Sequence, residues 1–294
     1  MRRICDEVQG GRVLVSDGAW GTFLQRRGLA PGECPELWCV EHPAVVREVA
    51  ESYVAAGADM IESNSFGGNR FKLEHFGLAQ RAGELNEAAA RISRAAAGDA
   101  RHVIASVGPT GRILFMGDVT AAEIYAAFKE QLAALERGGA DACCIETFAA
   151  LDEATLAVKA ARENTRLEVI CTFTFERTVR GDYRTMMGVA PGEMARAMLA
   201  AGADIVGANC GNGMPQMVEI VREMRQAAPR APLLAHANAG QPRIVRGRTV
   251  FPETPEEMAA NALRVVAAGA NIVGGCCGTT PDHIRAIARA VRPQ

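Results

Sequence analysis

Three cysteines stand where their sulfur atoms could bind one metal ion. Cys210 lies between Asn209 and Gly211, and Cys276 and Cys277 are adjacent within the segment Gly274-Gly275-Cys276-Cys277-Gly278. Three thiolates can hold Zn²⁺ and leave the fourth tetrahedral position for water or a substrate, which is typical of a catalytic zinc site.

The adjacent pair poses a geometric condition. Neighbouring residues of a regular strand point to opposite faces, so Cys276 and Cys277 reach one ion only where the backbone has left the strand. The flanking glycines permit this departure, because glycine accepts φ values that other residues resist. We therefore predict a zinc site, the alternative being a pair of ordinary buried cysteines.

The remaining six of the nine cysteines are expected in the core. The total is odd and two pairs are vicinal, which argues against a disulfide framework. These six residues are Cys5, Cys34, Cys39, Cys143, Cys144 and Cys171.

Polar side chains follow several of the apolar segments in which we expect strands. Asp17 and Glu146 are carboxylates that suit a substrate with an ammonium group, or they form structural ion pairs with loop arginines. Asn209 and Asn238 either orient substrate or metal ligands, or cap the following helices. His236 is expected to be a core histidine with its hydrogen bonds satisfied.

Two basic loops, 176–188 and 241–255, stand beside these residues in the predicted fold. By default they are solvated, and the alternative is that they receive an anionic donor or an acidic partner protein. Their arginines are Arg177, Arg180, Arg184, Arg243, Arg246 and Arg248.

The elements that position these residues follow from an internal repeat. Gly-Ala-Asp or Gly-Ala-Asn occurs at 57–59, 139–141, 202–204 and 269–271, each time between a helical pattern and a short apolar run. This is typical of a helix that ends at a glycine and is followed by a buried strand. The intervals suit two strand-helix units each, so a further strand is expected in every gap.

Eight strands and eight helices are therefore predicted to alternate. The strands are expected at Val13-Leu14-Val15, Met60-Ile61, Val103-Ile104-Ala105, Cys143-Cys144-Ile145, Val169-Ile170-Cys171, Ile205-Val206, Pro232-Leu233-Leu234-Ala235 and Ile272-Val273. The helices are expected near residues 44–56, 81–97, 120–138, 152–163, 191–201, 215–228, 255–268 and 281–292.

A single (β/α)₈ barrel (TIM barrel) of class α/β fits this pattern better than a doubly wound sheet. We expect one domain over residues 1–294, since the chain has no low-complexity linker. The active site of such a barrel is built at the carboxyl ends of its strands. Cys210 then follows the sixth strand and the cysteine pair the eighth, which we expect to be neighbours.

Composition excludes several classes of protein. Of the 294 residues 49% are hydrophobic, and 32 Lys and Arg against 34 Asp and Glu give a net charge of −2. This balance gives no reason to expect binding to nucleic acid or to an acidic membrane. No signal peptide or membrane span is indicated, so we expect a cytoplasmic enzyme that acts on a small molecule. The glycine patterns of nucleotide-binding loops and serine hydrolases are also missing.

Several segments together resemble the homocysteine S-methyltransferase family. They are Asp17-Gly18-Ala19-Trp20-Gly21-Thr22, Ile145-Glu146-Thr147, Ala208-Asn209-Cys210-Gly211, Asn238-Ala239-Gly240 and Val273-Gly274-Gly275-Cys276-Cys277-Gly278-Thr279-Thr280-Pro281. The resemblance runs from Val13 to Val291 and is greatest to the homocysteine-binding barrel of cobalamin-dependent methionine synthase. Glu41-His42-Pro43 is similar to the betaine-homocysteine methyltransferases instead.

This resemblance implies roles for the residues. Cys210, Cys276 and Cys277 would bind zinc, which activates the thiol of homocysteine for attack on a methyl group, and methionine would be the product. Asp17 and Glu146 would hold the amino group of homocysteine near the backbone of Gly18 and Ala19. Asn209 would contribute to substrate binding, and Asn238 matches an asparagine that approaches the metal when substrate is absent.

The methyl donor is expected to be a methyl-corrinoid, and it must be carried by a separate protein, because the chain has no Asp-x-His-x-x-Gly corrinoid signature. Betaine and S-methylmethionine are the alternative donors, and Trp20, where methionine synthases have a smaller methionine, could face a cationic donor. Another small thiol is the alternative acceptor. Outside enzymes, the alternative is a zinc-storage or regulatory protein, although zinc storage needs neither Asp17 nor Glu146. The sequence does not indicate an oligomeric state.

Overall fold

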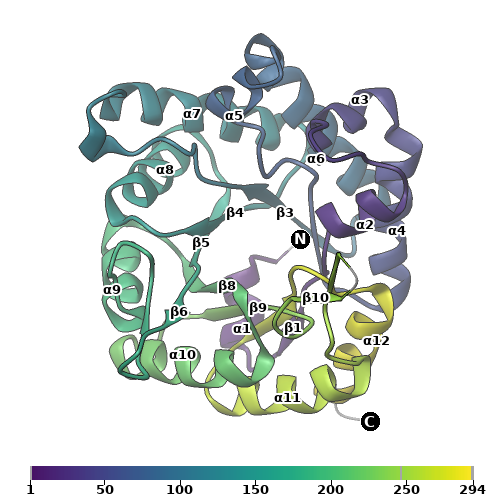
Figure 1. The fold of residues 1–294 in the computed structure, drawn as a ribbon, viewed down its shortest axis with the longest axis vertical. Coiled ribbons are helices and arrows are strands. Elements are labelled where there is room, and N and C mark those ends of the chain that lie inside the picture. The colour runs from purple at the N-terminus through teal and green to yellow at the C-terminus, as the bar shows by residue number, and fades with distance from the viewer. Residues whose placement is uncertain (1, 246, 293–294) are drawn as a thin grey trace.

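Eight parallel strands form one barrel in the computed structural model, which describes residues 2–245 and 247–292 (Figure 1). The strands hydrogen-bond in the order β1-β12-β9-β8-β5-β4-β3-β2, and a bridge between Ser16 and Met60 closes the ring. They are β1 (Leu14–Val15), β2 (Met60–Glu62), β3 (His102–Val107), β4 (Ala142–Phe148), β5 (Glu168–Phe173), β8 (Ile205–Gly213), β9 (Leu233–Asn238) and β12 (Ile272–Gly275). The predicted (β/α)₈ barrel is confirmed, and every predicted strand overlaps one of these.

Eight long helices surround the barrel, and they coincide with the predicted ones. They are α4 (Pro43–Ala56), α6 (Ala82–Ala97), α7 (Ala121–Arg137), α8 (Leu151–Asn164), α9 (Pro191–Ala201), α10 (Met214–Ala227), α11 (Pro255–Ala267) and α12 (Pro281–Val291). Gly57 and Gly202 end α4 and α9 with φ of 97° and 110°. The repeated glycine thus supplies the left-handed residue that turns each helix toward the next strand.

Apolar side chains fill both sides of the sheet. One face of each strand packs against the surrounding helices, and the other face fills the barrel interior. Leu14, Met60, Ile104, Ile170, Ile205, Leu234 and Ile272 form this inner layer. Because the interior is packed at this level, the open space of the barrel lies only beyond the strand ends.

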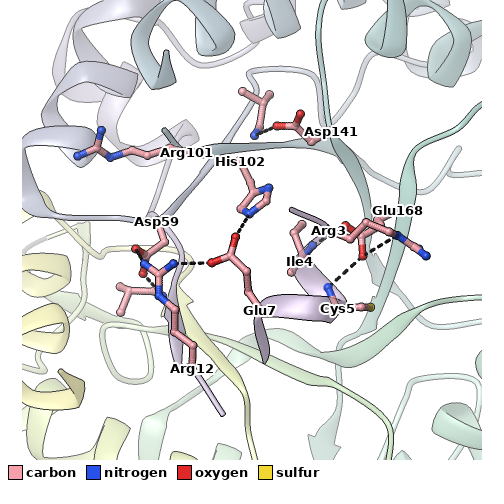
Figure 2. Close-up of polar contacts among 12 residues, drawn as sticks. Arg3, Ile4, Cys5, Glu7, Arg12, Asp59, Arg101, His102, Asp141 and Glu168 are labelled. Atoms are coloured by element: carbon pink, nitrogen blue, oxygen red, sulfur yellow. Dashed lines mark hydrogen bonds and ion pairs between the residues drawn. The ribbon is translucent and has the colours of Figure 1, made fainter. Parts of the chain in front are cut away.

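A short helix that sequence analysis missed closes the other end of the barrel. Helix α1 (Ile4–Gln9) inserts Ile4, Cys5 and Val8 against the inner layer. Figure 2 shows its polar anchors: Glu168 accepts hydrogen bonds from the backbone N–H of Ile4 (2.6 Å) and Cys5 (3.0 Å), and Glu7 contacts the His102 ring (2.8 Å). The carboxylate of Glu168 therefore neutralises the N-terminus of α1 at the bottom of the barrel.

Replacing Glu168 with alanine is expected to lower the free energy of unfolding by about 1–2 kcal/mol, because two N–H groups of α1 lose their acceptor. Metal binding and activity should not change, since Glu168 lies at the opposite end of the strands from the loops described next. Urea denaturation measures the loss, and Glu176→Ala, an exposed glutamate, is the control. Equal stability of the two variants would contradict the anchoring role.

The remaining short elements all lie in loops that follow the carboxyl ends of barrel strands. They are the helices α2 (Gly21–Arg26), α3 (Trp38–Glu41) and α5 (Arg70–Glu74), the 3₁₀ turns η1 (Pro35–Leu37), η2 (Ala79–Arg81) and η3 (Leu114–Met116), and two hairpins. The hairpins are β6 (Glu176–Arg177) with β7 (Tyr183–Arg184), and β10 (Arg243–Val245) with β11 (Arg248–Val250). This face of the barrel is hereafter called the mouth. Among the described helices, none has the length and apolar character needed to cross a membrane.

Candidate functional site

The three predicted cysteines meet at the mouth. The sulfur atoms of Cys210, Cys276 and Cys277 all lie within 4.8 Å of one another, and those of Cys210 and Cys277 are 3.9 Å apart. Zinc–sulfur bonds of about 2.3 Å at tetrahedral angles separate two sulfur atoms by about 3.8 Å. The spacing and the soft donor set of this cluster therefore fit a zinc ion with one coordination position left over.

The backbone meets the geometric condition set by the cysteine pair. Strand β12 ends at Gly275, so Cys276 and Cys277 lie beyond it, as predicted. The N–H of Cys276 still donates to the carbonyl of Ala237 (2.7 Å), and the carbonyl of Cys277 accepts from Ala239 (3.0 Å). These two bonds to the end of β9 hold both cysteines in place after the strand has ended.

Cys210 reaches the cluster by a different route. It has a φ of 58°, and the pairing of β8 with β9 is irregular between Asn209 and Gly213. The expectation that the sixth and eighth strands are neighbours was wrong, because β9 lies between β8 and β12. The left-handed residue turns the Cys210 side chain across the end of β9, which costs conformational energy and is typical of functional sites.

One thiol of the cluster, that of Cys210, differs from the other cysteines in its pKa. Hydrogen bonds from the Cys276 and Cys277 thiols lower the pKa of Cys210 to about 3, and the same contacts with Cys210 raise the pKa of Cys276 and Cys277. The other six cysteines are buried, as predicted, and burial raises the pKa of Cys171 well above that of a free thiol and the pKa of Cys143 to about 12. Thiolate character is therefore concentrated at the mouth.

A cavity of about 350 Å³ opens beside the sulfur atoms. The three cysteines form one part of its wall, Glu62 and Glu146 form another, and the rings of Trp20 and Phe66 contribute apolar surface. The volume suits a small amino acid better than a nucleotide or a polymer.

Glu146 is a buried carboxylate that faces this cavity from β4. One of its oxygens accepts a hydrogen bond from the Ser106 hydroxyl, and the other accepts from Asn209 Nδ2 at 3.0 Å. Burial raises the pKa of Glu146 to about 7. Within residues 2–245 and 247–292 it pairs with no arginine or lysine, so the structural ion pair considered from sequence is not formed, and a cation in the cavity would be its natural partner.

Asp17 is placed differently from Glu146. It is 1% exposed and lies behind the cavity wall, where Oδ2 accepts from Trp20 Nε1 (2.9 Å) and from the N–H of Glu62 (2.8 Å). Burial raises the pKa of Asp17 to about 7. The neighbouring Gly18 and Ala19 do line the cavity, and the N–H of Ala19 donates to Thr279 Oγ1 at 2.9 Å.

Asn209 is fully buried, and all of its polar groups are engaged. Its Oδ1 accepts from the N–H of Thr147 and from Thr172 Oγ1, both at 2.8 Å, and its Nδ2 donates to Glu146 and to Thr147 Oγ1. Thr147 has a φ of 65°, a conformation that needs support in a residue with a branched side chain. Asn209 therefore holds Glu146 and Thr147 in place and has no free group with which to contact a substrate.

Asn209→Asp is expected to lower the free energy of unfolding by about 2–3 kcal/mol, because a carboxylate oxygen would replace the donor that faces Glu146. The substitution preserves the shape of the side chain, so a loss of packing cannot explain the effect. Thermal and urea denaturation measure it. Gln226→Glu, the same amide-to-acid change at an exposed residue of α10, is the control, and an Asn209→Asp variant as stable as this control would contradict the role of Asn209.

Asn238 lies at the end of β9, next to the sulfur cluster. A hydrogen bond between its side chain and Cys210 contributes to the low pKa of that thiol, while Asn238 Oδ1 has no partner in the described part of the chain. This position agrees with the expectation that Asn238 lies close to the metal site.

Sequence analysis missed two residues of the cavity wall. His236 is buried but not satisfied as predicted: its Nε2 has no hydrogen-bond partner among the described residues. Glu62, the last residue of β2, also lines the cavity, and its Oε1 lies 3.5 Å from His236 Nδ1. A carboxylate at a strand end was a visible signal for Glu62, whereas its contact with His236 depends on closure of the barrel.

The two basic loops stand at the mouth, as predicted. Arg177 and Arg180 are exposed on the β6–β7 hairpin, and Arg184 pairs with Asp182 at 2.9 Å. Arg243 is exposed on β10, whereas Arg246 lies outside the described residues. A role for these loops in binding stays a prediction.

Comparison with known proteins shows which family the sequence matches. A sequence model described as homocysteine S-methyltransferase matches residues 14–291. The chain is 32% identical to methionine synthase of Mycobacterium tuberculosis over 97% of its own length but only 25% of the relative's. It is 30% identical to betaine-homocysteine S-methyltransferase 1 of Danio rerio, over 98% of this chain and 75% of the relative.

A solved structure supports the same fold. The metallated form of the homocysteine methyltransferase from Escherichia coli superimposes with a TM-score of 0.77 at 23% identity, over 94% of this chain and 96% of that one. The chain spans a quarter of the length of the methionine synthases that it matches.

Proposed function

The chain belongs to the homocysteine S-methyltransferase family, and from that premise we propose that it is a zinc-dependent enzyme that methylates the thiol of homocysteine to form methionine. The observation that carries this proposal is the cluster of three sulfur atoms within 4.8 Å of one another, beside a cavity with buried carboxylates. We further propose that the reaction takes place in the cytoplasm.

Zinc held by Cys210, Cys276 and Cys277 would lower the pKa of the homocysteine thiol and keep its sulfur nucleophilic. The residues of the chain orient the substrate around this sulfur. Glu146 receives the ammonium group, and the backbone of Gly18 and Ala19 bounds the cavity beside it. The sulfur supplies the electron pair of the new S–CH₃ bond, and the donor keeps the pair of the bond that breaks.

Exposed apolar side chains around the mouth favour a donor carried by a protein. Phe115 is 91% and Ile244 82% exposed, and Val179 is fully exposed, on loops that follow β3, β9 and β5. Large exposed apolar side chains on three loops of the same face suit contact with a protein, and a small donor such as betaine would need only the cavity. This supports a methyl-corrinoid protein, with betaine and S-methylmethionine as the alternatives.

The donor test adds methylcobalamin, betaine or S-methylmethionine to zinc-loaded protein with homocysteine, and methionine is quantified by mass spectrometry. We expect methylcobalamin to be demethylated as methionine appears. If methionine forms with betaine or S-methylmethionine but not with methylcobalamin, homocysteine is still the acceptor, and the proposal of a corrinoid donor is wrong. Zinc-loaded protein that does not bind homocysteine at millimolar concentration would exclude homocysteine as the acceptor and favour another thiol or a zinc-storage role.

The affinity for the product methionine is expected to fall as the pH drops below 7. The pKa of Glu146, which lines the cavity, is raised to about 7, so below this pH its carboxyl group becomes neutral and ceases to attract the ammonium group. The resulting loss of affinity is at most about tenfold per pH unit. Methionine has no thiol proton, so calorimetry between pH 6 and 8 isolates the carboxylate, and an affinity independent of pH would contradict its role.

A further inference from the structure

Two side chains of the cavity wall carry polar atoms without partners. In the described residues, Glu62 Oε1 and His236 Nε2 are buried and form no hydrogen bond. Glu62 is 8% exposed and His236 2%, and both line the cavity. An unpaired buried polar atom costs about 1–3 kcal/mol, so two of them at one cavity point to a ligand that supplies the missing contact.

The histidine does not neutralise the glutamate. Its Nδ1 lies 3.5 Å from Glu62 Oε1, but burial lowers the pKa of His236 to about 3, so the ring is neutral at physiological pH. Gly274 makes room for this ring, because a Cβ there would approach the His236 ring carbon Cδ2 to 3.0 Å. His236 is thus a neutral, polar support for Glu62.

The cavity also contains an excess of acidic over basic side chains. Burial first, and then the neighbouring carboxylates of Glu146 and Asp17, raise the pKa of Glu62 well above its usual value. Over residues 2–245 and 247–292, no arginine or lysine forms an ion pair with any of the three acids. A cation that enters the cavity would therefore pair with the carboxylate that has free oxygen atoms.

Comparison of the three acids shows which oxygen atoms are free. Both oxygens of Asp17 accept hydrogen bonds, Oδ1 from Ser16 (3.2 Å) and Oδ2 from Trp20 and the Glu62 backbone, and Asp17 lies behind the wall. Both oxygens of Glu146 also accept hydrogen bonds, from Ser106 and Asn209, but unlike Asp17 this side chain lines the cavity. Glu62 lines the cavity as well, and its Oε1 has no donor among the described groups. The arrangement thus presents Glu62 and Glu146 to a ligand, with Asp17 beneath them.

We propose that Glu62, supported by His236, binds the α-ammonium group of the thiol amino acid together with Glu146, and that Asp17 is a positioning residue. Asp17 fixes the indole of Trp20 and the backbone of Glu62, and through them it shapes the cavity. This inference rests on the proposed function, since it takes homocysteine as the ligand.

The test compares homocysteine with 4-mercaptobutanoate, which has the same thiol and carboxylate but no ammonium group. Calorimetry with zinc-loaded protein is expected to show that Glu62→Gln weakens homocysteine about ten- to hundredfold and changes the affinity for 4-mercaptobutanoate less than about threefold. Asp17→Asn should weaken both ligands to a similar extent, because its effect is indirect.

Two controls exclude a general loss of structure. The first control is the zinc content and thermal stability of each variant. The second is Glu153→Gln, because Glu153 is buried to a similar extent as Glu62 but accepts a hydrogen bond from the N–H of Thr110 and does not line the cavity. Glu62→Gln with unchanged homocysteine affinity, or with equal losses for both ligands, would overturn the inference. If wild-type protein binds 4-mercaptobutanoate and homocysteine equally, ammonium recognition is wrong as a whole, and if it binds neither, the proposed function fails.

Discussion

Cys276→Ser is expected to abolish both zinc retention and methionine formation. The substitution replaces one of three sulfur donors with a hydroxyl group, which remains protonated at neutral pH and is a poor ligand for zinc. Because three sulfur atoms meet at the site among the described residues, the loss of one leaves two, and we expect zinc affinity to fall by more than about 100-fold. Zinc per chain is measured by mass spectrometry after dialysis, and methionine formation is measured on the same samples.

Cys143→Ser is the matched control for this experiment. Cys143 is fully buried in β4 and belongs to the core that packs against the helices. Its replacement should lower thermal stability but leave one zinc per chain. A Cys276→Ser protein that forms methionine without zinc would contradict the assignment of the metal site.

Glu146→Gln is expected to lower kcat/KM for homocysteine by about 100-fold while zinc remains bound. The amide keeps the shape of the side chain and removes the charge that would pair with the ammonium group. Removing one partner of a buried charge pair typically costs 2–5 kcal/mol, which corresponds to about 30-fold or more. Steady-state kinetics with homocysteine as the varied substrate measure the change.

The effect of Glu146→Gln should be specific for the substrate. Glu168→Gln, at the opposite end of the barrel, is the control and should leave kcat/KM unchanged. If Glu146→Gln instead released zinc and left the affinity for homocysteine intact, Glu146 would belong to the metal site and not to substrate recognition.

The barrel could be predicted from the sequence because the residues that end each helix and begin each strand follow the same repeat as the fold. The repeated glycine at the ends of helices such as α4 and α9 marks where each strand begins, and the positive φ of Gly57 and Gly202 explains why glycine stands there. Helix α1 was missed because its six residues are too few to show helical periodicity, and it is held by a side chain 164 positions away, Glu168.

The meeting of the three cysteines was predictable for a related reason. The glycines around Cys276 and Cys277 signal a departure from regular strand structure, which the end of β12 at Gly275 confirms. The hydrogen-bond partners of Asp17 and Asn209 were not predictable, because they come from strands and loops that only the closed barrel brings together. The contact between Glu62 and His236 joins two residues far apart in sequence, and only closure of the barrel brings them together.

We propose that the three cysteines hold zinc and that the homocysteine thiol becomes its fourth ligand. X-ray absorption at the zinc edge counts the sulfur atoms around the metal with no assumption about the methyl donor. We predict three sulfur ligands and one lighter atom in zinc-loaded protein, and four sulfur ligands after homocysteine is added. A sulfur count that does not change on addition of saturating homocysteine would contradict the account.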